Sequence, residues 1–282
     1  MLPEVRKIRQ QHIFWIINNH PNSPIAGLPQ AIIDKNHEKE AYEQAKILWL
    51  KHVENNKDDI AITGNAAKFF FKDDQLLAAD LLAKMEQLDP KNVEWYNLLG
   101  IIYFGGTMVG PPDARKESAI KAVKEFEKAL NIVSDDERYT LLGDLAKASL
   151  AAGQDQEARN YSLELLERAS NNRNSALKWN YGNAIHDSNT ILGRLALRAG
   201  DLETAKQHLI KSGATPGSPQ LNTFGPNMIL AKELLERGEQ KTTLQYLELC
   251  ANFWELGSER LKNWQAIIKN GNIPDFGINL YF

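Results

Sequence analysis

Apolar residues along this chain recur every three or four positions, with polar residues between them. Ala41, Ala45, Leu48 and His52 are one such series. Because an α-helix turns once in about 3.6 residues, this spacing gathers the four side chains on one face. The same kind of pattern predicts helices outside the central region over residues 3–19, 38–54 and 258–269.

The central region repeats itself with a period of about 34 residues. One unit starts at Asp59 and the next at Val93. In the second unit, the matching positions are Tyr96, Leu99, Gly100 and Tyr103, followed by Ala122, Phe126 and Ala129. The small residues allow two helices to approach closely, and the large residues fill the space beside that contact. A helix pair that cannot bury its apolar face alone must stack on its neighbours.

These residues follow the large–Leu–Gly–Tyr and Ala–aromatic–Ala pattern of the tetratricopeptide repeat, so the chain resembles that family over residues 59–255. The 212–227 segment and the chain from Trp254 onward resemble bacterial members. The resemblance implies an all-α right-handed superhelix, a solenoid of about five helix pairs. We expect three parts: an N-terminal helical pair over 1–58, the repeats over 59–255, and a capping helix with an apolar tail over 256–282.

Three insertions interrupt the repeats, over residues 105–116, 171–182 and 212–227. The first is rich in glycine, but Pro111 stands where a phosphate-binding loop needs lysine, and the segment follows a helix instead of a strand. We therefore expect a mobile loop at the edge of a groove. The third insertion has three prolines and three glycines in sixteen residues, which predicts an irregular connection.

Charge and cysteine content exclude several classes of protein. The net charge is −3 and no basic block occurs, which argues against nucleic-acid binding. The apolar runs are too short for a membrane span. Cys250 is the single cysteine, so no internal disulfide can form. We expect a cytoplasmic protein; the alternative is an exported or periplasmic mature form whose leader has been removed.

Candidate catalytic chemistry is sparse. The six histidines are scattered without a zinc-binding spacing, and no nucleophile-elbow motif occurs. His186 and Asp187 are the one acid–base pairing. Neighbouring residues on a helix point about 100° apart, so Asp187 cannot orient the ring of His186. The sequence therefore predicts no metal and no cofactor, and it favours a protein without catalytic activity.

The resemblance also implies which side chains face a ligand, because the first helix of each tetratricopeptide pair lines the concave face. Carried onto this chain, the groove residues are Phe70, Asn97, Ile101, Phe104, Lys147, Asp187, Arg194 and Arg198. The second insertion adds Trp179, and the helix after it adds His186 and Asn189; the alternative is that the aromatic residues pack between units and the polar residues cap the start of the helix. Arg194 and Arg198 stand four apart and suit a carboxylate; the alternative is that they are ordinary solvated charges. The family's chaperone-binding clamp is missing, since Thr63, Ala67 and Leu98 occupy its positions.

Three hypotheses for function follow. The first is an interaction scaffold that binds a peptide or protein segment in the concave groove. The second is an enzyme or small-molecule binder with a pocket formed by His186, Trp179 and the 212–227 connection. The third is a homo-oligomer that assembles through the apolar tail Leu280-Tyr281-Phe282.

Overall fold

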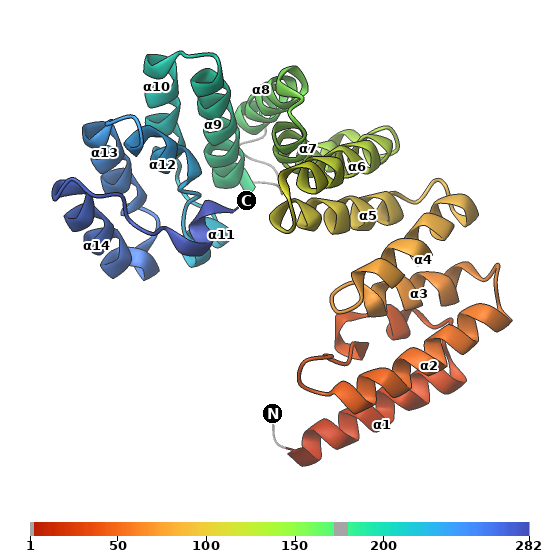
Figure 1. The fold of residues 1–282 in the computed structure, drawn as a ribbon. Helices are drawn as coiled ribbons and strands as arrows, with labels where there is room; N and C mark the ends of the chain where they lie inside the picture. Colours follow the sequence, from red (N-terminus) through yellow and green to blue (C-terminus); the bar gives the residue numbers. More distant parts are fainter. Residues whose placement is uncertain (1–2, 172–179, 282) are drawn as a thin grey trace. The chain divides into compact units, whose positions relative to one another are not determined.

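The computed structural model describes residues 3–171 and 180–281, and every regular element in those ranges is a helix (Figure 1). Within each of its two compact units, neighbouring helices pack on one another, which confirms the all-α prediction. None of the described helices combines the length and the apolar character that crossing a membrane requires.

The chain forms two compact units. The N-terminal unit comprises Met1–Gly105 and Lys124–Ile132, and the C-terminal unit comprises Gly106–Val123 and Val133–Phe282. Helix α6 (Pro112–Leu130) therefore contributes residues to both. The division near residue 105 does not coincide with the part boundary expected at residue 58, because the leading helices share a core with the helices that follow them.

The N-terminal unit is built from five helices besides its share of α6. They are α1 (Pro3–Asn19), α2 (Lys39–Asn55), α3 (Ile60–Phe70), α4 (Gln75–Leu88) and α5 (Val93–Gly105). Helices α1 and α2 lie side by side, and α3 packs on α4 (Figure 1). Four aromatic rings fill the core: the rings of Tyr42 and Phe69 stack at 5.5 Å, with Trp49 and Phe70 beside them.

The connection between α1 and α2 is compact and lies against α3. It contains two 3-10 turns, η1 (Pro24–Gly27) and η2 (Pro29–Ala31), and Ala26 and Ile33 within it are buried. The side-chain amide of Asn65 on α3 donates to the carbonyl oxygens of Pro21 and Ser23, both at 2.9 Å. These two bonds fasten the connection to the helix that it covers.

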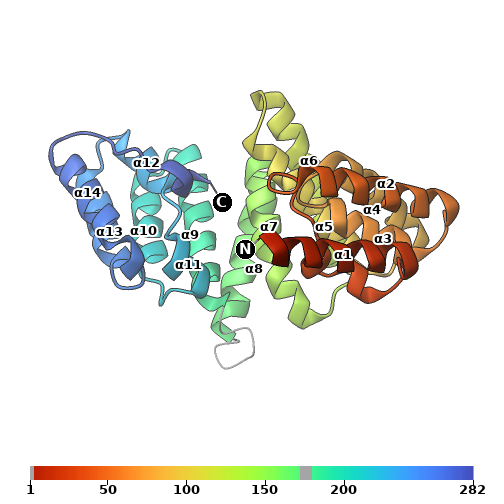
Figure 2. The same ribbon diagram turned by 90° about the horizontal axis from the view of Figure 1, so that it is seen from below.

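The C-terminal unit continues the series of helices. They are α7 (Asp135–Ala152), α8 (Asp155–Asn171), α9 (Tyr181–Arg198), α10 (Leu202–Gly213), α11 (Pro219–Phe224), α12 (Ile229–Leu235), α13 (Gln240–Cys250) and α14 (Ser258–Lys269). Helix α8 packs on α7 and α9, α9 packs on α10, and α13 packs on both α10 and α14 (Figure 2).

Small residues permit the close helix contacts that the repeat pattern predicts. A Cβ atom at Gly100 would lie 2.5 Å from the ring of Phe126, and one at Gly193 would lie 2.4 Å from Leu230. Both distances are too short for two carbon atoms, so only glycine allows these approaches. The helix ends follow local sequence as well: Asp59 accepts a hydrogen bond from the Ile62 amide at 2.9 Å and starts α3.

Two of the predicted insertions fold differently from expectation. The 105–116 segment is a short turn, because η3 (Gly106–Met108) follows α5 at once and α6 already begins at Pro112. Proline is favoured in the first turn of a helix, which explains that early start. The 212–227 connection contains the helix α11, which Ser218 caps by accepting a hydrogen bond from the Leu221 amide at 3.0 Å. Most of the 171–182 insertion lies outside the described residues.

Candidate functional site

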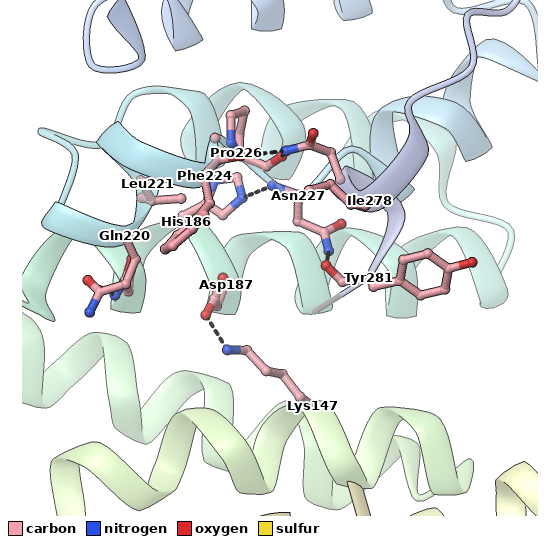
Figure 3. Close-up of a pocket in the computed structure, with 13 residues that line it drawn as sticks. Lys147, His186, Asp187, Gln220, Leu221, Phe224, Pro226, Asn227, Ile278 and Tyr281 are labelled. Atoms are coloured by element: carbon pink, nitrogen blue, oxygen red, sulfur yellow. Dashed lines mark hydrogen bonds and ion pairs between the residues drawn. The ribbon is translucent and has the colours of Figure 1, made fainter. Parts of the chain in front are cut away.

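Four segments of the C-terminal unit surround a pocket of about 260 Å³ (Figure 3). They are α7, α9, the α11 connection and the chain from Ile278 to Tyr281. A second pocket of about 190 Å³ adjoins it and shares Lys147, Asn183, Asp187 and Gln220. We call the two together the α7–α9 cleft.

His186 fixes the back wall of the cleft. Its side chain is fully buried, its Nδ1 lies 3.1 Å from the carbonyl oxygen of Ser212, and its Nε2 accepts a hydrogen bond from the Asn227 amide at 2.9 Å (Figure 3). A ring that donates from Nδ1 and accepts at Nε2 is neutral. Burial lowers the pKa of His186, which favours this neutral form. Both nitrogens are engaged by the backbone, so neither is available for proton transfer to a ligand.

The C-terminal segment forms another wall because polar side chains hold it in place. The amide of Asn279 donates to the carbonyl oxygens of Phe224 and Pro226, at 3.1 and 3.0 Å. The side-chain amide of Asn227 donates in turn to the carbonyl oxygen of Tyr281 at 2.9 Å, whereas its backbone amide donates to His186. Phe276 packs against Trp264 of α14, with ring centroids 5.0 Å apart. The tail therefore folds back on the capping helix, as the sequence predicts.

The floor of the cleft carries charge. Lys147 on α7 and Asp187 on α9 form an ion pair with 2.6 Å between Nζ and Oδ2 (Figure 3). Burial lowers the pKa of Lys147, but the carboxylates of Asp187 and Asp144 outweigh that effect and raise it, so the ammonium stays charged. Burial raises the pKa of Asp144; Lys147 opposes the rise and Asp187 adds to it.

Side-chain amides line the side of the cleft. Asn183 donates to the side-chain oxygens of Asn180 and Gln220, at 2.7 and 3.1 Å, and accepts from the Ser218 hydroxyl at 2.5 Å. Since both acceptors turn their oxygens toward Asn183, the amide nitrogens of Asn180 and Gln220 have no partner within residues 3–171 and 180–281. These nitrogens are donors that a ligand can use.

The rim of the cleft is apolar and exposed. Phe224 is 66% exposed, Ile278 is 72% exposed and Tyr281 is 58% exposed. All three line the larger pocket. Three large apolar side chains exposed together at the mouth of a polar pocket are typical of a surface that a partner covers. In the part of the chain that the structure describes, no group of three His, Cys, Asp or Glu residues is placed to hold a metal ion.

The structure brings some of the predicted site residues together and separates others. Lys147, His186 and Asp187 line the cleft. Asn189 does not, because it is buried, donates to the Ile185 carbonyl and lies 2.9 Å from the ring of His208. Trp179 lies outside the described residues.

The two arginines of α9 are each committed to a different acidic residue. Arg194 makes three hydrogen bonds to the carboxylate of Glu233, between 2.8 and 3.1 Å. Arg198 pairs with Asp155 and donates to the Leu150 carbonyl. Both partners lie about forty residues away in the chain, so the four-residue spacing alone could not reveal them. The arginines therefore do not form a joint clamp in this structure.

In the N-terminal unit, one predicted groove residue is misplaced. Phe70 has no exposed surface and packs against Tyr42 with ring centroids 6.5 Å apart, so the prediction that it lines a groove is wrong. Asn97, Ile101 and Phe104 lie on α5 with part of their surface exposed. The side-chain oxygen of Asn97 is buried without a hydrogen-bond partner.

Sequence reasoning proposed the 212–227 connection as a pocket wall without singling out Gln220 or Phe224 as site residues, and it assigned the tail to self-assembly and not to the cleft. Phe224, Ile278 and Tyr281 occupy no repeat position, and Gln220 lies in an apparently irregular connection. Their only sequence signal is the presence of large apolar residues in segments that break the repeat.

No protein-family model matches the chain, and no curated protein matches it in sequence. Several solved structures resemble it, among them PilW and PilF. PilW, described as a widely conserved type IV pilus biogenesis factor, has a TM-score of 0.47 and 16% identity, covering 93% of this chain and 99% of that chain. PilF of Pseudomonas aeruginosa has a TM-score of 0.45 and 16% identity, covering 93% of this chain and 97% of that chain. Similarity at this level identifies no binding residue.

Proposed function

We propose that this protein is a non-catalytic interaction scaffold whose α7–α9 cleft binds a segment of another protein. The observation that carries the proposal is the combination of unpaired amide donors inside the cleft with three exposed apolar side chains at its rim. Hydrogen bonds of His186 and Asn279 hold the segments that form the walls of the cleft in place. The protein therefore loses little conformational entropy when a ligand binds.

An extended peptide can supply the hydrogen-bond acceptors and the apolar side chain that would complement this surface. Its backbone carbonyl groups can accept hydrogen bonds from the amide nitrogens of Asn180 and Gln220, and an apolar side chain of the peptide can cover Phe224 and Ile278. Burial of such a side chain supplies affinity, and the amides fix the direction and register of the bound segment.

The alternative of an enzyme or small-molecule binder has weaker support. His186, its candidate acid–base group, uses both ring nitrogens in backbone contacts. The larger pocket, at about 260 Å³, is also smaller than the roughly 300–1,000 Å³ of pockets that enclose drug-sized ligands. A peptide needs no such enclosure because part of it stays in solvent.

Asn97, Ile101 and Phe104 on α5 remain a second proposed contact surface, in the N-terminal unit. The side-chain oxygen of Asn97 is buried, so the exposed parts of Ile101 and Phe104 would make most of such a contact. Self-assembly through the tail stays a prediction, although the contacts of Asn279 and Phe276 are made within the chain.

The test is a screen of the full chain against an array of random peptides, followed by titration of the best binders. We expect Phe224→Ala to weaken binding about tenfold or more, as loss of an exposed aromatic anchor does. Gln220→Ala should weaken it about two- to tenfold through one lost hydrogen bond. Because Phe224 is exposed, its loss should leave the melting temperature unchanged.

The matched control is Leu76→Ala, which removes an 85% exposed apolar side chain from α4 of the N-terminal unit. Its affinity for the same peptides should equal that of the unmodified chain. Equal affinity in all three variants would show that the peptides bind elsewhere, and the assignment of the cleft would then be wrong.

A further inference from the structure

We propose that the α7–α9 cleft selects a protein segment that carries a lysine or arginine, whose cationic group pairs with Asp144, next to an apolar residue that covers the rim. This inference rests on the function proposed above and adds the chemistry of the bound segment. Within the described residues, the charged side chains that line the cleft are two carboxylates and one ammonium, so one negative charge has no counterpart among them.

Among the residues that the structure describes, three formally charged ones line the cleft: Lys147, Asp187 and Asp144. Lys147 and Asp187 are already joined at 2.6 Å. The carboxylate of Asp144 accepts no hydrogen bond from any described residue, although it senses both neighbours electrostatically. The cleft thus holds one ion pair and one further carboxylate.

A carboxylate withdrawn from water without a partner is costly, and a cation placed beside it removes most of that cost. Asp144 is partly buried and lines the smaller pocket, and burial raises its pKa although the charge of Lys147 opposes the rise, so a second cation beside this carboxylate would be stabilised. Among the described residues that line the cleft, Lys147 is the only cation, and Asp187 engages it. A positively charged group from a partner is therefore the missing counterpart.

The cation is better supplied by a long side chain than by a metal ion. A metal would need at least a third ligand beside the two carboxylates, and the described chain places no further His, Cys, Asp or Glu there. The ammonium of Lys147, which pairs with Asp187 and acts on Asp144 only electrostatically, also repels a divalent ion. A lysine or arginine needs a single carboxylate and reaches it on a flexible stem.

The rim determines what must accompany the basic residue. Phe224, Ile278 and Tyr281 line the larger pocket, whereas Asp144 lines the smaller one. Gln220 and Asn183 lie in both. A segment that crosses this shared part places a basic side chain at one end and an apolar side chain at the other. An acidic segment would meet two carboxylates and one engaged ammonium, and is disfavoured.

The experiment is a display selection of random peptides on four immobilised full-length proteins: the unmodified chain, Asp144→Asn, Asp144→Lys and Glu248→Lys. Glu248 is an exposed acidic residue of α13 in the same unit, so it controls for net charge. We expect peptides selected by the unmodified chain and by Glu248→Lys to be enriched in lysine or arginine beside an apolar residue. Asp144→Asn should lose the basic preference, and Asp144→Lys should reverse it toward acidic residues.

Affinity supplies the second measurement. A peptide selected by the unmodified chain should bind Asp144→Asn about ten- to a hundredfold more weakly, the range for a charge-assisted hydrogen bond. Asparagine has nearly the same shape as aspartate, so the melting temperature of Asp144→Asn shows whether the cleft is intact even if the lysine variant does not fold.

The outcomes separate this inference from the function on which it rests. Suppose that the selected peptides lack basic residues but bind the Phe224→Ala variant more weakly than the unmodified chain. This result would support the peptide-binding function and would contradict the role of Asp144. Equal affinity for the unmodified chain and Asp144→Asn would overturn it as well. Failure of the unmodified chain to select any peptide family would contradict both.

Discussion

Replacement of His186 by phenylalanine tests the wall that holds the cleft together. The buried ring makes two hydrogen bonds to backbone groups, the Ser212 carbonyl and the Asn227 amide. Phenylalanine keeps a ring at this position and leaves both groups unpaired. Each unpaired buried group costs about 1–3 kcal/mol, so we expect the free energy of unfolding at pH 7.5 to fall by about 2–6 kcal/mol. Urea denaturation followed by circular dichroism measures this change.

The pH dependence of the free energy of unfolding gives a second measurement on the same substitution. Burial lowers the pKa of His186 in the folded protein, whereas an unfolded histidine has a pKa near 6.5. As the pH falls below about 6.5, the unfolded chain takes up a proton that folded His186 resists. Folding stability is therefore lost toward low pH, by up to about 1.4 kcal/mol per pH unit for this one group.

The variant lacks that contribution, so its stability deficit should be smaller at pH 5.5 than at pH 7.5. His208, whose pKa burial also lowers, is present in both proteins and cancels in the difference. His12→Phe, a change at an exposed position on α1, is the control and should leave the free energy of unfolding at pH 7.5 unaltered. Parallel pH profiles for His186→Phe and the unmodified chain would refute the neutral, doubly bonded state of the ring.

Two further substitutions test other parts of the structure. Asn279→Ala removes both side-chain bonds to the Phe224 and Pro226 carbonyls; we expect a loss of about 1–3 kcal/mol in urea denaturation and faster proteolytic removal of the tail. A tail that resists protease as before would contradict this fastening. Phe70→Ala should cost about 3–5 kcal/mol, because the ring lies in the aromatic core. A loss below about 1 kcal/mol would instead fit an exposed groove residue.

The sequence predicts the helices and their packing well because both depend on short-range patterns. The close approach at Gly100 follows directly from the Gly and aromatic positions of the repeat. The helix predicted over residues 3–19 matches α1, Pro3–Asn19. Helical spacing and small residues are local properties, so they are visible without knowledge of distant contacts.

The cleft could be predicted only in part, because its walls come from distant segments. Lys147 and Gln220 border the same space although more than seventy residues separate them in the chain. The repeat places Lys147 and Asp187 on inner helix faces but carries no information about which segment of the C-terminal tail lies opposite. His186 was recognised as notable, yet its role depends on the Ser212 and Asn227 backbone, which no side-chain pattern specifies.

The misplaced Phe70 has a similar cause. The family pattern assumes that the inner face of each first helix is open, but here Phe70 packs against Tyr42 of α2, and the compact connection between α1 and α2 also lies against α3. Asn65 holds that connection through the carbonyl oxygens of Pro21 and Ser23. No repeat position signals this arrangement.

That connection has a consequence for how the chain tolerates change. Surface loops usually accept insertions at little cost, since closing a longer loop adds only a small entropic penalty. Between α1 and α2 the rule should fail, because one added residue would shift Ala26 and Ile33 out of their buried positions and break the register with Asn65. We therefore expect insertions and deletions in this proline-rich stretch to be tolerated as poorly as they are in the interior of a helix.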